Sequence, residues 1–286
     1  MAENSDHGAA PVALEWGTLP PFRLKLHERT DQFVSNDIRR FKVWEPFETS
    51  VVLAFLAPGG TFLDIGANIG WYSIVAGLTV GAAGRVIAFE PDPLNFSLLR
   101  ENAALNALAN IELVNKAASD RDGRGLLFLS PDNLGDHRLF PAVEQRHSVA
   151  IETIRVDSFF GHQPPAIDVV KMDCQGAEGH IVAGMRETLN HSANAGRTPL
   201  VMEFWPHGLR GAGTAPDALI DTLEAMATIA CLIDEQSATL IPIAWPDLRR
   251  RAAGDLHPDT QHFVNILVTP RGRALPPALA ERVAAL

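Results

Sequence analysis

The sequence is poor in cysteine and in positive charge, and both shortages narrow what the protein can be. Only two cysteines, Cys174 and Cys231, occur in 286 residues, too few for the disulfide framework of a small secreted domain. Lys and Arg together number 24 against 34 Asp and Glu, giving a formal net charge of −10. Because a nucleic-acid surface needs clustered Lys and Arg to neutralise phosphates, we expect no nucleic-acid partner.

Long apolar runs are also missing. No window approaches the ~20 uninterrupted apolar residues that a membrane helix needs, and the N-terminal stretch MAENSDHGAAPVALEWG lacks the apolar core of a signal peptide. The sequence holds no cluster of His and Cys that would signal a metal site. A globular, soluble, cytoplasmic protein with no membrane partner is expected, and the sequence does not specify its oligomeric state.

Strand-like and helix-like segments alternate through most of the chain. Apolar strand segments occur in the order TFLDIG, RVIAFE, IELVNKA, IDVVKMD and PLVMEFW, separated mainly by segments of helical spacing. Such alternation predicts βαβ units and a mostly parallel sheet. Residues 124–157 break the pattern and predict a β-hairpin insertion. The strand-like segments after a helix at 216–228 follow without a full helix between each pair, which predicts an antiparallel edge.

The stretch TFLDIGANIG joins an apolar strand to a helix through a turn with glycines four residues apart. Gly66 and Gly70 allow the backbone to approach a ligand closely, and the helix that follows offers unpaired N–H groups. Asp64 precedes the first glycine, and Asn68 lies between the two. Glu90 ends the second strand, whose tip neighbours the first in a doubly wound sheet. A carboxylate there suits a ribose diol, since it can accept hydrogen bonds from both hydroxyls.

Three interpretations of this turn are open: a purely structural bend, a nicotinamide or flavin site, and an S-adenosylmethionine site. A nicotinamide fingerprint would read G-x-G-x-x-G, whereas Asn68 stands at the middle position. The anionic Asp64 would repel a diphosphate, but it would attract the sulfonium and ammonium groups of S-adenosylmethionine. The residues therefore favour S-adenosylmethionine.

Five motifs occur in order along the chain: FLDIGANIGWYS, VIAFEPDPLNFSLLRENAALN, NKAAS, VDSF and IDVVKMDCQGAEGHIVAGM. Together they resemble the FkbM-type S-adenosylmethionine-dependent methyltransferases over residues 35 to 205. The resemblance implies an α/β class I methyltransferase fold, Rossmann-like, with a mostly parallel seven-stranded sheet. Residues 1–50 would then form an N-terminal extension with a cap helix, and residues 51–286 the cofactor-binding domain. Characterised members of the family are mostly O-methyltransferases of natural products or sugars.

The resemblance also implies a set of cofactor-binding residues. The segment that ends the third strand is where the family's motif meets the adenine. The family carries an acidic residue at the position of Gln175, in a D-x-E-G-x-E stretch, so this chain departs from the pattern there. The predicted cofactor set is Asp64, Gly66, Asn68, Gly70, Glu90, Pro91, Asn115, Ala117 and Asp173.

Four side chains are candidates for catalysis. Asp173 ends the strand IDVVKMD, a tip that faces the methyl group in this fold, so it could position the acceptor hydroxyl or the ammonium group of the cofactor; a helix cap is its alternative role. Glu178 follows in the first helical turn, where the helix dipole alone could explain it. Glu203 and His207 lie at the end of PLVMEFW. Since histidine is suited to take a hydroxyl proton near neutral pH, His207 is the predicted base, with a merely exposed loop histidine as the alternative.

Three residues are candidates for contact with the acceptor. Gln175 can hydrogen-bond a substrate, and Trp205 can form an apolar wall. His137, in the insertion, is a rival base on a loop that could close over the substrate and exclude water. The sequence thus predicts an S-adenosylmethionine-dependent O-methyltransferase that acts on a small hydroxylated molecule, a natural product or sugar, and releases S-adenosylhomocysteine. A nicotinamide-dependent oxidoreductase and a non-catalytic cofactor-binding protein are the alternatives.

Overall fold

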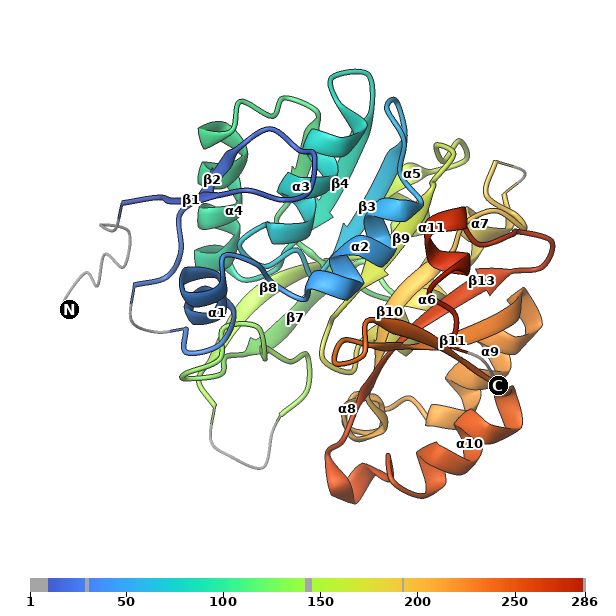
Figure 1. Cartoon of the computed structure of the whole chain (residues 1–286). Coiled ribbons are helices and arrows are strands. Elements are labelled where there is room, and N and C mark those ends of the chain that lie inside the picture. The colour runs from blue at the N-terminus through green and yellow to red at the C-terminus, as the bar shows by residue number, and fades with distance from the viewer. Residues whose placement is uncertain (1–9, 29–30, 142–145, 192, 285–286) are drawn as a thin grey trace.

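A sheet of eight strands crosses the molecule (Figure 1). The structure is a computed structural model that describes residues 10–28, 31–141, 146–191 and 193–284. The strand order is β12-β11-β13-β10-β9-β3-β4-β5. These strands are β3 (Thr61–Ile65), β4 (Arg85–Phe89), β5 (Ile111–Val114), β9 (Val169–Met172), β10 (Leu200–Phe204), β11 (Ala227–Asp234), β12 (Thr239–Ile243) and β13 (Val264–Pro270).

Strand direction divides the sheet into a parallel part and a mixed part. The strands β5, β4, β3, β9 and β10 are parallel to their neighbours in that series. The strand β13 is antiparallel to both β10 and β11, and β12 is antiparallel to β11. The predicted class I, Rossmann-like architecture is confirmed, with eight strands in place of the expected seven because β12 extends the sheet. The antiparallel strand β13 lies inside the sheet, so β12 alone forms an antiparallel edge.

Alternating side chains along the strands build two cores, one on each face of the sheet. Leu63 and Ile65 of β3 belong to the first core, whereas Phe62 belongs to the second. The first core is covered by α5 (Val156–Phe160), α6 (Glu178–Gly184), α7 (Arg186–Asn190), α8 (Pro206–Gly211), α9 (Pro216–Met226) and α10 (Trp245–Ala253). The second is covered mainly by α2 (Pro46–Ala54), α3 (Trp71–Val80) and α4 (Pro93–Leu105). Both faces are therefore buried, as a parallel sheet requires.

Two helical segments differ from the sequence expectation. The helix expected after Ala177 is divided, since α6 ends at Gly184 and α7 begins at Arg186. The helix α10 lies between β12 and β13, where no full helix was expected. Its Arg249 pairs with Asp221 and Glu224 of α9, so α10 is held on the outside of the sheet. Among the described residues, no helix is long and apolar enough to cross a membrane.

The N-terminal segment packs against α4 through two asparagine side chains. It contains a hairpin of β1 (Val12–Leu14) and β2 (Phe22–Leu24), followed by α1 (Val34–Phe41). Asn102 accepts a hydrogen bond from the N–H of Lys25 at 2.7 Å and donates to its carbonyl at 3.0 Å. Asn106 does the same for Arg23 at 2.9 Å and 2.7 Å. The domain boundary proposed after residue 50 falls within α2, so that helix is shared by the two parts.

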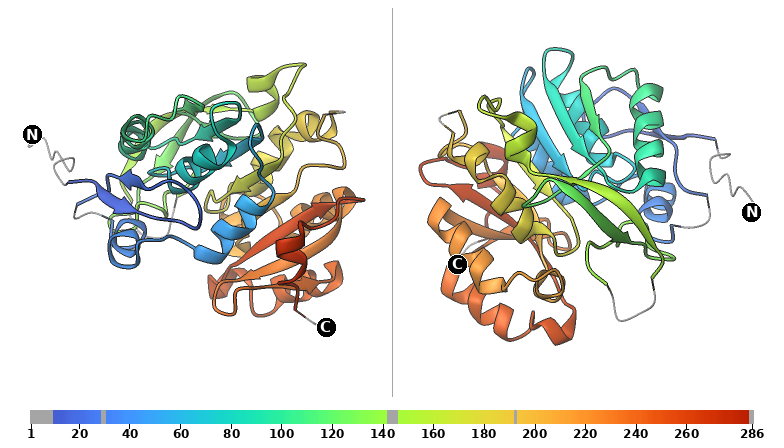
Figure 2. Two further views of the ribbon diagram at one scale, coloured as in Figure 1. Left: turned by 45° about the horizontal axis from the view of Figure 1, so that its top comes forward. Right: turned by 180° about the vertical axis from the view of Figure 1, so that it is seen from behind.

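A β-hairpin leaves the sheet at the expected insertion. It consists of β7 (Gly123–Phe128) and β8 (Ser148–Ile154), which pair antiparallel, and the short β6 (Ala117–Ala118) joins β8 in parallel. Seen from behind, the hairpin crosses the molecule in front of the parallel strands (Figure 2). The loop between β7 and β8 returns to the carboxyl ends of β3 and β4, where the candidate site lies. The remaining elements are the 3-10 helix η1 (Pro258–Thr260) and α11 (Pro277–Ala280).

Candidate active site

Two adjoining cavities lie at the carboxyl ends of the parallel strands. The inner cavity is lined by residues that include Phe89, Glu90, Pro91, Lys116, Ala117, Ala118, His137, Leu139 and Cys174. The outer cleft is lined by residues that include Trp44, Glu45, Trp71, Tyr72, Arg138, Lys171, Glu203 and Trp205. Five residues line both spaces: Gly66, Asn68, Gly135, Asp173 and Gln175. The inner cavity and the outer cleft therefore share a wall.

The two predicted glycines have different roles at the turn after β3. Gly66 has a φ of +83°, and a Cβ there would lie 2.1 Å from the carbonyl oxygen of Asp173. Only glycine permits both that backbone conformation and that close approach of β3 to β9. Gly70 has a φ of +97° and precedes α3, and a Cβ there would lie 2.6 Å from Leu99 Cδ1. Gly70 lines neither space, so it shapes the helix start and does not face a ligand.

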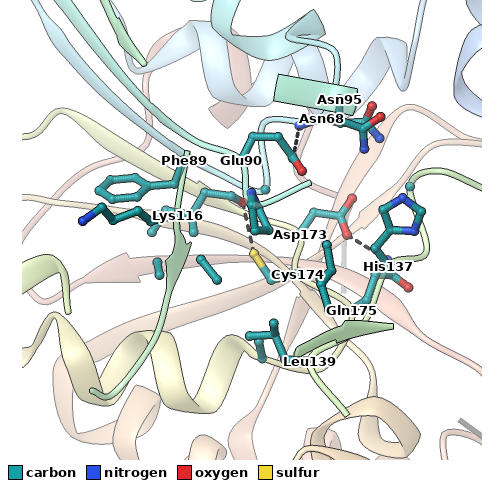
Figure 3. Close-up of a pocket in the computed structure, with 18 of the residues that line it drawn as sticks. Asn68, Phe89, Glu90, Asn95, Lys116, His137, Leu139, Asp173, Cys174 and Gln175 are labelled. Atoms are coloured by element: carbon teal, nitrogen blue, oxygen red, sulfur yellow. Dashed lines mark hydrogen bonds between the residues drawn. The ribbon is translucent and has the colours of Figure 1, made fainter. Parts of the chain in front are cut away.

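Glu90 connects the ends of β3 and β4 at the inner cavity (Figure 3). Its Oε2 accepts a hydrogen bond from the N–H of Asn68 at 2.7 Å, and its Oε1 accepts one from the N–H of Asp92 at 2.8 Å. Burial raises the pKa of Glu90 from its usual 4.5 to about 8, although both backbone hydrogen bonds oppose the rise. Each carboxylate oxygen retains a further lone pair. Glu90 is thus able to accept hydrogen bonds from a ligand's hydroxyls.

Asp64 lies behind the glycine turn, which differs from the expected contact with a cationic ligand. Its side chain is fully buried and lines neither the inner cavity nor the outer cleft. The Oδ2 atom accepts a hydrogen bond from Ser73 Oγ at 2.5 Å. Burial raises the pKa of Asp64 to about 6. Because Ser73 belongs to the first turn of α3, Asp64 fixes the helix that follows the turn and acts on the site indirectly.

The expected adenine segment divides into a lining part and a supporting part. Pro91 and Ala117 line the inner cavity. Asn115 does not; its Nδ2 donates to the carbonyl oxygens of Glu90 at 2.8 Å and Pro91 at 3.2 Å. Asn115 therefore holds the backbone beside Glu90 in place from outside the cavity.

Asp173 lines both spaces, and Figure 3 shows it among the residues of the inner cavity. Its Oδ2 lies 3.3 Å from Nζ of Lys171, and its Oδ1 accepts a hydrogen bond from Nε2 of Gln175 at 2.9 Å. The same nitrogen lies 3.4 Å from Oε2 of Glu203. A carboxylate at position 175 could not donate to these two acids, so the departure from the family pattern provides a link between them. The alternative role of Asp173 as a helix cap is not observed, because α6 has no side-chain cap.

Lys171 is a site residue that the sequence analysis missed. It lies within β9 directly beside Asp64 in the register and is only 3% exposed. Its Nζ is 4.5 Å from the centroid of the Tyr72 ring. Because lysine is almost never fully buried without a partner, a lysine inside the apolar run VVKMD was an available signal.

Lys171 faces a group of carboxyl side chains between the sheet and α2–α3, which we call the acidic layer. Its members are Glu45, Glu48, Asp64, Asp173 and Glu203. The Tyr72 hydroxyl lies 2.8 Å from Oε2 of Glu45 and 3.1 Å from Oε1 of Glu48. Burial raises the pKa of Glu45 to about 7 and raises the pKa values of Glu48 and Glu203 well above their usual range. Carboxyl groups thus outnumber ammonium groups in this layer.

Residues 133–139, in the loop that follows β7, contribute to the lining of both spaces. The carbonyl of Leu134 accepts a hydrogen bond from Asn95 Nδ2 at 2.9 Å. The guanidinium carbon of Arg138 lies 4.6 Å from the Trp205 ring centroid, and Arg138 pairs with Asp136 at 2.7 Å. These contacts attach the hairpin to α4 and to the end of β10.

His137 and Trp205 contribute to the walls of different spaces. His137 lines the inner cavity, where its Nδ1 accepts a hydrogen bond from the N–H of Ser130 at 3.1 Å. Burial lowers the pKa of His137, which favours the neutral imidazole. Trp205 lines the outer cleft and donates from Nε1 to the carbonyl of Gln261 at 3.0 Å.

Two predicted catalytic residues lie outside both spaces. The Nδ1 of His207 is 2.6 Å from the carbonyl oxygen of Pro258, and its ring packs on Trp205 with centroids 5.2 Å apart. Glu178 is fully buried, and its Oε1 accepts a hydrogen bond from the N–H of Cys174 at 2.8 Å. Neither side chain lines the inner cavity or the outer cleft. The geometry therefore favours Asp173 and Glu203 over His207 and Glu178 for contact with an acceptor.

Comparison with known proteins identifies the family. Residues 64–204, from Asp64 in β3 to the end of β10, match the methyltransferase FkbM domain. The chain is an FkbM-family methyltransferase. Its donor is S-adenosylmethionine, which removes the nicotinamide interpretation of the glycine turn. Within the described part of the chain, no group of three or more His, Cys, Asp or Glu could hold a metal ion.

Several relatives of the FkbM methyltransferase are moderately similar in sequence. It is 28% identical over 183 residues to 2-O-methyltransferase NoeI of Sinorhizobium fredii, covering 58% of this chain and 73% of the relative. It is 27% identical over 188 residues to methyltransferase sdnD of Sordaria araneosa, covering 54% of this chain and 70% of that one. The crystal structure of methyltransferase FkbM from Methylobacillus flagellatus aligns with a TM-score of 0.43 at 17% identity, over 74% of this chain and 44% of that chain.

Proposed function

We propose that this methyltransferase transfers a methyl group to a hydroxyl of a small molecule, with the donor in the inner cavity and the acceptor in the outer cleft. The position of Asp173 carries the proposal, because its side chain belongs to the wall that both spaces share. The similarity to a protein named as a 2-O-methyltransferase supports a hydroxyl acceptor. Natural products and sugars are the acceptor classes expected from the sequence.

The residues of the inner cavity fit the donor by their chemistry. S-adenosylmethionine supplies a methyl group that its sulfonium has already activated. Glu90 would accept hydrogen bonds from the ribose hydroxyls, as carboxylates at the second strand tip do in related folds. The glycine turn at Gly66 and Asn68 would bring the backbone close to the donor, and Phe89 with Leu139 would provide apolar walls. Asp64 and Asn115 would support this arrangement from behind.

The chain's own residues would align the acceptor. Asp173 would accept a hydrogen bond from the acceptor hydroxyl and receive its proton on a carboxylate oxygen. Lys171, whose Nζ lies 3.3 Å from Oδ2 of Asp173, would hold this carboxylate in position. Holding the hydroxyl in line can contribute about 7–11 kcal/mol of barrier reduction, and proton removal a further 10²–10⁴-fold or so. The hairpin loop over both spaces would exclude water.

Replacing Asp173 tests this assignment. In Asp173→Asn, which keeps the shape and removes the charge, we expect turnover to fall by roughly 10²–10⁴-fold. S-adenosylhomocysteine affinity should stay within a few-fold, since the inner cavity remains intact. Turnover is measured by chromatography, as the S-adenosylhomocysteine formed when a panel of hydroxylated acceptors is supplied. Calorimetric titration measures the affinity for S-adenosylhomocysteine. Asp217→Asn, on the exposed face of α9, is the matched control.

Two outcomes would contradict the proposal in different ways. Native turnover in Asp173→Asn would remove Asp173 as the group that meets the hydroxyl. Tight binding of S-adenosylhomocysteine, with none formed from S-adenosylmethionine in the presence of any hydroxylated acceptor, would favour a non-catalytic binding protein instead.

A further inference from the structure

The outer cleft contains more carboxyl groups than cations, and this imbalance indicates the class of acceptor. We propose that the acceptor carries a positively charged amino group near its reacting hydroxyl, and that Glu203 and Glu45 bind this group. The proposal rests on the methyl transfer proposed above and specifies the molecule that enters the outer cleft.

Glu203 is the first observation. Its side chain lines the outer cleft and is only 6% exposed, and its Oε1 is buried without a hydrogen-bond partner among the described residues. No ion pair within 4.0 Å is found for it in the described ranges. An ionised carboxylate in such a place is costly unless a cation pairs with it. An ammonium group in the cleft would satisfy the orphaned oxygen and the charge together.

The charged groups around Glu203 do not supply that cation. The nearby acids are Asp173 at the end of β9, Glu178 of α6 and Glu45 before α2, and Lys171 of β9 is a cation whose charge opposes them. Arg138, which also lines the outer cleft, pairs with Asp136. Burial, followed by the acids Asp173 and Glu178, raises the pKa of Glu203. Lys171 is already paired with Asp173. Burial among these acids therefore disfavours the charged form of Glu203, and a bound cation would favour it.

Glu45 is the second observation, and it comes from a different element. It directly precedes α2, lines the outer cleft and has a φ of +41°, a left-handed conformation that non-glycine residues rarely adopt. Such backbone strain costs of the order of 1–3 kcal/mol and is concentrated at ligand sites. Its Oε2 meets the Tyr72 hydroxyl at 2.8 Å, and no cation forms an ion pair with it in the part of the chain described.

The remaining walls of the outer cleft suit an organic cation. Trp44, Trp71 and Tyr72 are among the residues that line the space, and aromatic rings attract ammonium groups, as Lys171 Nζ over the Tyr72 ring shows. Phe33 and Phe263, at 50% and 56% exposure, line the same cleft and would meet an apolar portion of the acceptor. The formal net charge of −10 would favour the approach of a cation from solution.

A neutral polyol is the competing occupant, because carboxylates also accept hydrogen bonds from hydroxyls. A polyol and a cation differ in whether their binding releases protons from the protein. A polyol can bind the acids without changing their protonation. A cation favours the ionised form and displaces protons from acids that hold them, such as Glu45, whose pKa burial raises to about 7. Amine affinity should consequently rise with pH as Glu45 ionises in the free protein.

The test compares benzylammonium with benzyl alcohol on the full chain loaded with S-adenosylhomocysteine. Calorimetric titration near neutral pH, in two buffers of different ionisation enthalpy, gives the affinity and the number of protons released. We expect benzylammonium to bind about tenfold tighter or better, with proton release. Glu203→Gln and, independently, Glu45→Gln should each reduce this preference. Glu281→Gln, at an exposed position near the C-terminus, is the matched control and should retain it.

Three results would overturn the amine proposal: equal affinities of the two compounds, no binding of either, or a preference that survives in both cleft variants. The separate titration with S-adenosylhomocysteine keeps the two proposals distinguishable. If S-adenosylhomocysteine binds and is produced normally while benzylammonium and benzyl alcohol bind with equal affinity, the proposed methyl transfer stands and the cationic acceptor is rejected. If S-adenosylhomocysteine does not bind, the proposed function itself fails.

Discussion

Each acidic side chain at the strand ends meets a different environment, and that environment separates their tasks. Asp64 is enclosed and bonded to Ser73, so it stabilises α3. Glu90 faces the inner cavity with both oxygens on backbone N–H groups. Asp173 stands beside Lys171 in the shared wall, and Glu203 retains an unpartnered oxygen on the cleft side. The same functional group anchors a helix at Asp64, and we propose that it serves as a diol acceptor at Glu90, an orienting base at Asp173 and a cation acceptor at Glu203.

The placement of His207 leads to a test at the scale of one residue. In His207→Asn we expect turnover to change by less than roughly tenfold, because the ring is held by Pro258 and lines neither space. Removal of a true general base would cost about 10²–10⁴-fold. Steady-state kcat with any accepted substrate decides between the two. A loss in the larger range, with native acceptor affinity, would restore His207 as the base.

At the scale of elements, the turn between β3 and α3 depends on the space around Gly66. In Gly66→Ala we expect loss of S-adenosylhomocysteine affinity and a lower melting temperature, because the added Cβ would meet the Asp173 carbonyl at 2.1 Å. Gly81→Ala, after α3, is the matched control, since Gly81 also has a positive φ, +65°, but has open space around its Cβ. It should lose only the roughly 1–3 kcal/mol of a strained backbone and bind normally.

Thermal unfolding and calorimetric titration of the two glycine variants measure this difference. Equal losses of stability and affinity in both variants would show that φ strain alone limits the turn. The close approach of β3 to β9 would then have no separate importance.

The sequence predicted the parallel strands and the glycine turn because their signals are local. An apolar run that ends in Asp64 or Glu90 identifies a strand and its tip without knowledge of the rest of the fold. The helix α10 was not predicted, although Trp245, Leu248 and Ala252 recur at helical spacing and are buried. The orientation of Asp64 and the partner of His207 depend on strand register and on a distant loop, which no local pattern encodes.

At the scale of the whole molecule, the buried acids link folding stability to pH. Burial raises the pKa of Glu90 to about 8, of Glu45 and Glu178 to about 7, and of Asp64 to about 6. In the unfolded chain these groups ionise near 4.5, or 3.8 for Asp64. Between the two values the folded state binds more protons, so stability must fall as pH rises through this window.

We therefore expect the melting temperature of the cofactor-free protein to decrease as the pH rises from about 4.5 to about 8. Calorimetric melting across this range measures the slope. Glu90→Gln removes one titrating group from the folded state, so its slope should be smaller. A flat profile in the native protein would show that these carboxyl groups ionise alike in the folded and unfolded states.

The wall shared by the inner cavity and the outer cleft has a thermodynamic consequence. Five residues line both spaces: Gly66, Asn68, Gly135, Asp173 and Gln175. A side chain of this wall that is displaced by the donor therefore alters the surface offered to the acceptor, and the converse holds as well. Any factor by which the nucleoside changes the dissociation constant of the acceptor must, by reciprocity, equal the factor by which the acceptor changes that of the nucleoside. Donor and acceptor are thereby expected to bind as an energetically coupled pair and to depart from independent-site saturation.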